Sequence, residues 1–135
     1  INKIYNFHQY NIYSEGSKEK DKDPRLDQKK ENNDNIHTAC YLASEGELEQ
    51  LQSLYIKGFN LNQGDYDGRT PLHLACCVNK IEIVKFLIEK CNCDINVYDR
   101  WENTPLEDSE RHNNNEITAY LLSRKAKRYN ELNVN

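Results

Sequence analysis

A three-residue motif that recurs at a fixed interval constrains the fold of this chain more than any other feature. Thr70-Pro71-Leu72 returns as Thr104-Pro105-Leu106, 34 positions later. Two further pairs share this offset: Asn62 with Asn96, and Asp65 with Asp99. A period of this length is typical of small helical units that stack side by side, because each is too small to bury a core alone. The sequence therefore predicts a stack of units.

A weaker copy precedes these two. Three of its leucines align with aliphatic residues of the middle copy at an offset of 33: Leu48, Leu51 and Leu54 with Ile81, Val84 and Leu87. Residues 58–62 then resemble the end of the middle copy, residues 91–96, which is one residue longer. Three copies are about the minimum for a stable stack.

The middle copy predicts two helices preceded by a turn. Pro71 suits the first turn of a helix, where its missing N–H costs nothing, and Thr70 can cap that helix. Asp67-Gly68 supplies the turn. The apolar positions have helical spacing: Leu72, Leu74 and Ala75 in the first helix, and Ile81, Val84, Phe86, Leu87 and Ile88 in the second. We expect His73 to bond the backbone of its own turn.

A period near 33 residues with the pattern T-P-L-H-x-A is the signature of ankyrin repeats. We therefore expect an all-α fold, an ankyrin-repeat solenoid of about three repeats, preceded by a short helical remnant and a disordered linker. The expected segments are 1–13 (end of an upstream catalytic domain), 14–34 (disordered linker), 35–64, 65–98 and 99–123 (repeats), and 124–135 (polar tail). The linker has only Leu26 as a sizeable aliphatic, too little to offset the entropy of ordering. The tail should fray.

The third repeat departs from the pattern as the end of a stack should. Glu102 replaces the turn glycine, Glu107 replaces His73, and Ser109 replaces Ala75. Greater polarity on an outer helix is what a terminal repeat needs for solubility. The irregular first copy would cap the other end.

Bulk properties exclude several classes of function. The formal net charge of −4 argues against a nucleic-acid partner. No apolar run approaches the roughly 18 residues of a membrane span, and no secretory leader is recognisable, so we expect neither membrane insertion nor secretion. The chain begins with Ile1 and contains no Met, so we expect a fragment or processed product of a longer protein.

The five cysteines are Cys40, Cys76, Cys77, Cys91 and Cys93. An odd number without a leader predicts reduced thiols in the cytosol or an organelle matrix. The alternative is a zinc cluster of His73 with the last four cysteines, but Cys-x-Cys is not the usual spacing of zinc ligands. We favour core packing, because a buried free Cys behaves as a small hydrophobe, and expect no metal or cofactor.

No catalytic residue is predicted. Ser17 and Lys20 match the S-x-x-K spacing of penicillin-recognising and glutaminase-type serine enzymes, but such a pair needs burial and an oxyanion hole and this one lies in the most polar stretch. The four histidines are scattered, and no Gly-rich phosphate loop is present. A basic cluster follows the last repeat: Arg124, Lys125, Lys127 and Arg128. A solvated helix end is the favoured interpretation of this cluster, over a patch for an anionic partner.

A binding surface at the tips of the repeat loops remains. The candidate partner-binding residues are Tyr66, Asp67, Arg69, Arg100 and Trp101. Aromatic residues and Arg are enriched in the hot spots of protein interfaces. We therefore expect a protein partner, or self-association, through these finger tips. For Trp101, packing over the adjacent finger is an equally favoured alternative.

Three motifs, taken in order, resemble the C-terminal region of animal-type glutaminases of the kidney and liver types. Asn6-Phe7-His8-Gln9-Tyr10 is similar to the end of the family's catalytic domain, and Asp23-Pro24-Arg25 to its linker. Asp99-Arg100-Trp101-Glu102-Asn103-Thr104-Pro105 is similar to the last ankyrin repeat. The resemblance covers about residues 4–122.

This resemblance implies a parent enzyme that hydrolyses L-glutamine to L-glutamate and ammonia on a β-lactamase-like domain upstream of Ile1. The segment itself would be non-catalytic and serve assembly or protein interaction in a homotetrameric parent, located in mitochondria or the cytoplasm. Two alternatives stay open: an ankyrin adaptor module of a non-glutaminase protein, and the ankyrin part of an asparaginase-type amidohydrolase.

Overall fold

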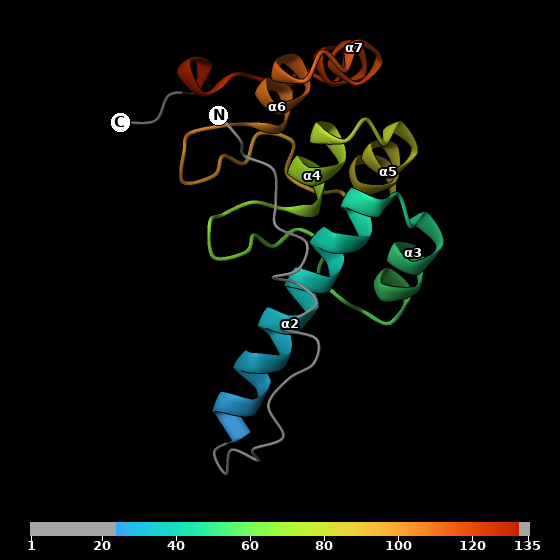
Figure 1. Ribbon diagram of the computed structural model, residues 1–135, viewed down its shortest axis with the longest axis vertical. Coiled ribbons are helices and arrows are strands. Elements are labelled where there is room, and N and C mark those ends of the chain that lie inside the picture. The colour runs from blue at the N-terminus through green and yellow to red at the C-terminus, as the bar shows by residue number, and fades with distance from the viewer. Residues whose placement is uncertain (1–23, 133–135) are drawn as a thin grey trace.

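The computed structural model describes residues 24–132, and over that range it is helical, with no strand. Three helix pairs follow one another (Figure 1): α2 (Pro24–Glu45) with α3 (Leu48–Ile56), α4 (Pro71–Cys77) with α5 (Ile81–Lys85), and α6 (Pro105–Arg111) with α7 (Asn115–Ser123). A π-helical turn, η1 (Phe86–Lys90), continues α5, and a 3-10 turn, η2 (Tyr129–Glu131), follows α7. The all-α solenoid predicted from the period is confirmed.

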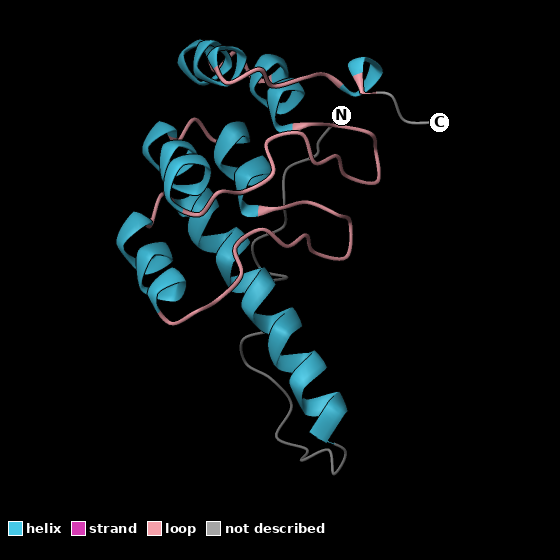
Figure 2. Ribbon diagram, turned by 180° about the vertical axis from the view of Figure 1, so that it is seen from behind, coloured by secondary structure: helices cyan, strands magenta, loops and turns pink. Residues whose placement is uncertain are grey.

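The helix pairs stack in register. The first helices form one layer, in which α4 packs between α2 and α6. The loops that join one pair to the next extend to the same side of the stack (Figure 2), and we call them finger 1 (residues 57–70) and finger 2 (residues 91–104). Fully buried aliphatic side chains come from all three pairs: Leu51, Leu72, Ile83, Val84, Leu87, Leu106, Ile117 and Leu121. The stack therefore has one continuous core, as a repeat protein requires.

Helix α2 begins earlier than the sequence predicted. It starts at Pro24, so the part of the expected disordered linker from residue 24 to residue 34 is helical. Proline is favoured in the first turn of a helix, and the following residues are mostly Arg, Leu, Gln, Lys and Glu, which have good helix propensity. Figure 1 shows this end of α2 extending beyond the stack. The expected helical remnant at 1–13, and the linker as far as residue 23, lie outside the described residues.

Each repeat places a left-handed residue at the same two points. Between the two helices of a pair these residues are Gly46, Asn79 and Asn113, with φ of 78°, 61° and 57°. After the second helix they are Gly58, Asn92 and Lys125, with φ of 89°, 56° and 64°. Glycine and asparagine tolerate this conformation best, which explains five of the six residues. The backbone thus repeats more faithfully than the sequence does.

A π turn absorbs the extra residue of the middle repeat. The second helix starts 33 positions after its counterpart, at Ile81 against Leu48, but its left-handed end lies 34 positions after, at Asn92 against Gly58. Within η1 the N–H of Cys91 donates to the carbonyl of Phe86, five residues back, at 3.1 Å. An inserted residue in a helix is commonly accommodated in this way.

Reciprocal capping boxes start α4 and α6. Thr70 Oγ1 accepts from the N–H of His73 at 3.4 Å, and His73 Nδ1 accepts from the N–H of Thr70 at 3.0 Å. In the third repeat Thr104 and Glu107 make the same exchange, at 3.3 and 3.1 Å. Each box satisfies two backbone donors at a helix start. The expectation that His73 bonds its own turn is confirmed.

The tip of finger 2 contains a strained residue. Glu102 has φ of 63°, at the position where finger 1 has Gly68 with φ of 75°. A non-glycine residue in this region is disfavoured by contact of its Cβ with the backbone. Glu102 is exposed, so burial of its side chain does not compensate for the strain.

Replacing this residue should stabilise the protein. We expect Glu102→Gly to raise the free energy of unfolding by about 1 kcal/mol, because glycine adopts a positive φ without steric cost. Urea titration followed by circular dichroism measures the change. The matched variant Gly68→Ala should lower the free energy by a similar amount, and equal stability of both variants and wild type would contradict the assignment of strain.

The tail docks instead of fraying. Ala126 is buried, and the N–H of Lys127 donates to Asn96 Oδ1 at 2.8 Å. The N–H of Tyr129 donates to Glu107 Oε1 at 2.9 Å. The sequence prediction of a fraying tail is therefore wrong for residues 124–132, because Asn96 and Glu107 supply acceptors for this segment. Residues 133–135 lie outside the described range.

Among the described residues, no helix is both long enough and apolar enough to cross a membrane.

Candidate functional site

The tips of the two fingers have the same hydrogen-bonded geometry. Asp65 Oδ1 accepts from the backbone N–H groups of Asp67 and Arg69 at 2.9 and 3.0 Å. Asp99 Oδ1 accepts from those of Trp101 and Asn103, both at 2.9 Å. One carboxylate per finger thus closes the turn and fixes the residues next to it. This explains why Asp65 recurs as Asp99, 34 positions later.

Four of the five predicted partner-binding residues lie on the surface at these tips. Tyr66 is 93% exposed and Trp101 46% exposed. Arg100 and Asp67 join the fingers: the N–H of Arg100 donates to the carbonyl of Asp67 at 2.9 Å, and Arg100 Nη1 contacts Asp67 Oδ1 at 3.0 Å. The Arg100 guanidinium also lies 5.3 Å from the centre of the Trp101 ring. We call Tyr66, Asp67, Arg100 and Trp101 the finger ridge.

The fifth predicted residue, Arg69, does not belong to this surface. Its side chain is 1% exposed and points inward, under the fingers. The expectation that it projects from the tip is wrong, because acidic side chains from the next repeat converge on its guanidinium. A surface partner cannot contact this side chain in the folded stack.

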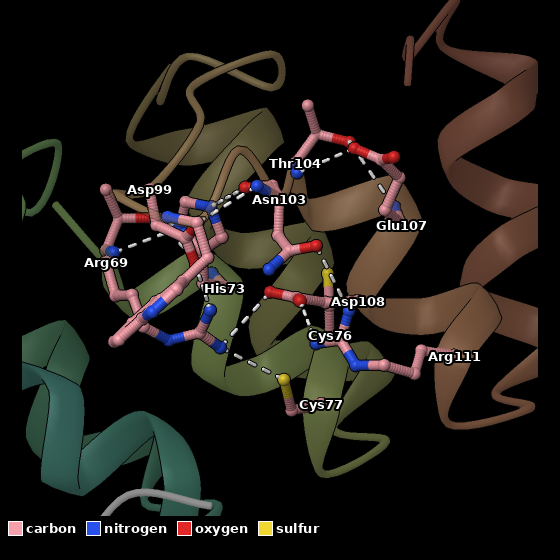
Figure 3. Close-up of polar contacts among 12 residues, drawn as sticks. Arg69, His73, Cys76, Cys77, Asp99, Asn103, Thr104, Glu107, Asp108 and Arg111 are labelled. Carbon is pink, nitrogen blue, oxygen red and sulfur yellow. Dashed lines mark hydrogen bonds and ion pairs between the residues drawn. The ribbon is translucent and has the colours of Figure 1, made fainter. Parts of the chain in front are cut away.

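Arg69 is the centre of a buried ionic network between the second and third repeats (Figure 3). Arg69 Nη1 contacts Asp99 Oδ2 at 2.5 Å, and Nη2 contacts Asp108 Oδ2 at 3.2 Å. Arg111 pairs with the other oxygen of Asp108. Both aspartates have fully buried side chains. Buried charges of this kind are tolerated only when they are paired and hydrogen-bonded.

The network keeps Asp99 ionised. Burial alone would raise the pKa of the Asp99 carboxyl, but the hydrogen bond from the N–H of Asn103 and the Arg69 guanidinium outweigh it. The net result is a pKa below the usual value for Asp. Because Asp99 also closes the tip of finger 2, the same carboxylate connects the finger ridge to the core.

His73 makes a second connection between the repeats. Its Nδ1 accepts from Thr70, so the tautomer carries its proton on Nε2, and Nε2 donates to the carbonyl of Asn103 in finger 2 at 3.0 Å. Desolvation by burial lowers the pKa of the imidazole, with a smaller opposing effect of Asp108. His73 is therefore a neutral donor that holds finger 2 against α4.

The cysteines near this network do not have the character of nucleophiles. Burial, with a smaller contribution from Asp108, raises the pKa of the Cys77 thiol to about 11, although Arg69 Nη2 lies 3.2 Å from its sulfur. Burial also raises the pKa of the Cys76 thiol well above its usual value. Reactive thiols have lowered pKa values. Among the described residues, no group of three or more His, Cys, Asp or Glu side chains has an arrangement that could hold a metal ion.

Asn114 links the third repeat to the end of α4, a contact that was not predicted from the sequence. Its Nδ2 donates to the carbonyls of Cys76 and Cys77 at 2.6 and 3.2 Å. These carbonyls belong to the last turn of α4, where they have no helical partner. The middle repeat has Lys80 at the equivalent position. The change from lysine to asparagine was therefore the one feature of the sequence that could have indicated this contact.

Loss of this side chain should destabilise the stack. We expect Asn114→Ala to lower the free energy of unfolding by about 1–2 kcal/mol, because two buried carbonyls lose their donor. Thermal unfolding followed by circular dichroism tests this expectation. Asn115→Ala is the matched control, because Asn115 is exposed and should change the stability by less than about 0.5 kcal/mol.

The remaining candidate residues have different outcomes. Ser17, Lys20 and His8 lie outside the described residues. Three residues of the basic cluster agree with a solvated helix end: Arg124 caps the end of α7, and Arg124, Lys125 and Lys127 are exposed. The fourth, Arg128, pairs with Glu110 and Glu131, and these contacts were not predicted from the sequence.

Comparison with known proteins places this geometry in context. A family model of ankyrin repeats, in three copies, matches residues 22–133. The chain is 34% identical over 118 residues to the mitochondrial liver isoform of glutaminase from Mus musculus, and 33% identical over 118 residues to that from Rattus norvegicus. It is also 31% identical over 84 residues to an L-asparaginase from Dirofilaria immitis.

These matches differ in how much of the chain they include. Each glutaminase alignment covers 87% of this chain, whereas the asparaginase alignment covers 62%. The chain spans about a fifth of the length of the glutaminases, with 19% of each covered. The similarity to glutaminases thus concerns one region of much longer proteins.

Proposed function

The chain belongs to the ankyrin-repeat family, and on this basis we propose that it is a non-catalytic protein-interaction segment that binds through the finger ridge. The observation that carries the proposal is the exposure of Tyr66 on finger 1 and of Arg100 and Trp101 on finger 2, with the two fingers fixed to each other and to the core. Exposed aromatics beside Arg, on a rigid support, fit the composition of interface hot spots.

We propose further that this segment is part of a glutaminase, whose catalytic residues lie outside this chain. Similarity to two glutaminases over 87% of the chain supports this parent, as do the ordered motifs at Asn6–Tyr10, 23–25 and 99–105. The parent would hydrolyse L-glutamine to L-glutamate and ammonia, as a homotetramer. The mitochondrial relatives support a mitochondrial location, and a cytoplasmic one is the alternative.

Two other parents remain as the second candidates. The similarity to an L-asparaginase supports an asparaginase-type amidohydrolase, and similarity to a potassium channel and to protein kinases of Arabidopsis thaliana supports an ankyrin module without any amidohydrolase. These alignments cover 44% to 62% of the chain, less than the glutaminase alignments. We therefore prefer the glutaminase parent.

The interaction proposal predicts that binding depends on two aromatic side chains. The chain would serve as bait for proteins of its source organism, quantified by mass spectrometry, and compared with the variant Tyr66→Ala/Trp101→Ala. Loss of one hot-spot aromatic costs about 2 kcal/mol, roughly 30-fold in affinity, so the double variant should lose the partner.

The control variant is Ile56→Ala. Ile56 is 83% exposed at the end of α3, away from the finger tips, and its loss should leave the bound proteins unchanged. Retention of every bound protein by the double variant, with helix content intact, would show that the finger ridge is not the interface.

A further inference from the structure

The tail occupies a site formed by finger 2 and α6, and four consecutive residues of the tail, 126–129, lie at this site. We call residues 124–132 the strap. Ala126 is 7% exposed, and the N–H groups of Lys127 and Tyr129 donate to Asn96 Oδ1 and Glu107 Oε1. The strap therefore binds through its backbone as well as its side chains.

Two side chains of the strap add specific contacts. Arg128 forms a bidentate ion pair with Glu110. Arg128 Nε donates to Glu110 Oε1 at 3.0 Å, and Arg128 Nη2 donates to Glu110 Oε2 at 2.5 Å. The Tyr129 ring packs edge to face against Tyr98 of finger 2, with ring centres 5.0 Å apart. A fork-to-fork pair selects Arg over Lys, and an edge-to-face contact selects an aromatic ring. The site thus recognises the pattern small–any–Arg–aromatic.

The strap repeats a contact that is made one repeat earlier. Asn62 Oδ1 accepts from the N–H of Asp94 at 3.0 Å. Asn96, 34 positions after Asn62, accepts in the same way from the N–H of Lys127 at 2.8 Å. The strap thus occupies, on finger 2, the position that residues 91–98 occupy on finger 1. The acceptor of Asn96 suits any extended segment with a suitable N–H.

The exchange of His73 for Glu107 adapts the end of the stack to this role. In the middle repeat His73 donates Nε2–H to the next finger. Glu107 keeps the capping hydrogen bond to Thr104 but presents an acceptor instead, and the N–H of Tyr129 uses it. Together with Glu110, this makes the edge of α6 acidic, whereas the strap is basic.

The contacts that hold the strap are those of a reversible association. Arg128 and Glu110 remain 40% and 32% exposed, and salt weakens ion pairs of this exposure. Ala126 is the only buried side chain among residues 124–132, and it contributes little apolar area. A covalently attached ligand with weak individual contacts occupies its site because of its high effective concentration.

We propose that the acidic edge where finger 2 meets α6, formed by Asn96, Tyr98, Glu107 and Glu110, is a peptide-binding site that the strap occupies in cis. The partner is an extended segment of another protein with the pattern small–any–Arg–aromatic, and it binds by displacing the strap. This site is separate from the finger ridge and does not depend on the parent enzyme. Because the strap competes, the affinity for the partner segment is reduced in the intact chain.

A labelled peptide with the sequence of residues 124–132 tests the proposal. Its binding to the full chain is measured by fluorescence anisotropy, with wild type compared with the strap variant Arg128→Ala/Tyr129→Ala. We expect the strap variant to bind the peptide at least about tenfold more tightly, because its own strap no longer competes. Adding Glu110→Gln to the variant, or Arg128→Ala to the peptide, should abolish binding.

Three results would overturn the proposal. Equal peptide binding by wild type and by a folded strap variant would mean that the strap is a fixed cap. Unfolding of the strap variant, seen by circular dichroism, would make the strap an integral part of the core. Dimerisation of wild type that Arg128→Ala/Tyr129→Ala abolishes in sedimentation velocity would assign the site to the strap of a second copy of this chain.

Discussion

Arg69→Met should destabilise the stack more than any other substitution considered for this protein. The variant leaves Asp108 without one of its two guanidinium partners and Asp99 without the guanidinium of Arg69, and both aspartates have fully buried side chains. Breaking a buried ion pair from one side typically costs about 3–5 kcal/mol, because it leaves an uncompensated buried charge. Urea unfolding followed by circular dichroism measures the loss.

The matched control is Arg100→Met. Arg100 also pairs with an aspartate between the fingers, but its side chain is 58% exposed, and exposed pairs contribute about 0–1 kcal/mol. The double variant Arg69→Met/Asp99→Asn should recover part of the lost stability, because it removes a buried charge and keeps an oxygen for the finger turn. A loss at Arg69 no larger than at Arg100 would contradict the role of the buried network.

The pH dependence gives an independent readout of the same network. The pKa of Asp99 is lowered in the folded state, so the unfolded chain binds its proton first as the pH falls. The stabilisation is therefore complete above the unfolded pKa, near pH 4, and is lost as the pH falls towards the lower folded pKa. Arg69→Met should lose less stability than wild type over this acidic interval.

His73→Ala should have the second largest effect, about 2–4 kcal/mol. The substitution removes the acceptor of the Thr70 N–H and the donor to the Asn103 carbonyl. A buried backbone group left without its partner costs about 1–3 kcal/mol, and the imidazole of wild type is fully buried. The same urea titration measures this loss at pH 8, where the histidine is neutral in both the folded and the unfolded chain.

At acidic pH, the free energies of unfolding of His73→Ala and wild type should differ by less than they do at pH 8. Burial lowers the pKa of His73, so between the ordinary value of 6.5 and the lower folded pKa only the unfolded chain is protonated. The folded state of wild type thus loses stability as the pH falls below about 6.5. The variant has no imidazole at position 73, so it does not undergo this loss. His112→Ala, at an exposed position, should match wild type at pH 8; equal losses from both substitutions would contradict the assigned role of His73.

The parts of the fold that the sequence predicted well are those fixed by local chemistry. Thr70-Pro71 and Thr104-Pro105 start helices because the threonine caps the helix and the proline fits its first turn, and both caps formed as expected. The apolar spacing of residues 81–88 predicted the second helix of the middle repeat. The sequence shows that the middle repeat is one residue longer than the first. It does not show that a π turn accommodates this extra residue.

The candidate site was predicted less completely because its contacts cross between repeats. Tyr66 and Trp101 lie at turn tips, where sequence position alone indicates exposure. Arg69 lies in the same turn, and its burial depends on Asp99 and Asp108, which are 30 and 39 residues away. Stacking brings these residues together. The acidic neighbours of Arg69 in the sequence, Asp65 and Asp67, make other contacts: Asp65 closes the turn of finger 1, and Asp67 pairs with Arg100.

The strap shows the same limitation at the end of the chain. A polar segment after the last repeat predicts fraying when only its own composition is considered. Its order comes from Asn96, Glu107 and Glu110, which belong to earlier elements. The exchange of His73 for Glu107 was visible as a departure from the repeat, but its consequence required the position of the tail.

The central claim is that this stack serves a glutaminase and catalyses nothing itself, and ammonia release tests it most directly. An antibody raised against residues 65–125 would capture the endogenous protein, and L-glutamine and L-asparagine would be assayed in parallel, with the recombinant 135-residue chain as control. We predict glutamine-specific release by the captured protein and none by the chain alone. Release from asparagine instead, or no release by a captured protein no longer than this chain, would contradict the account.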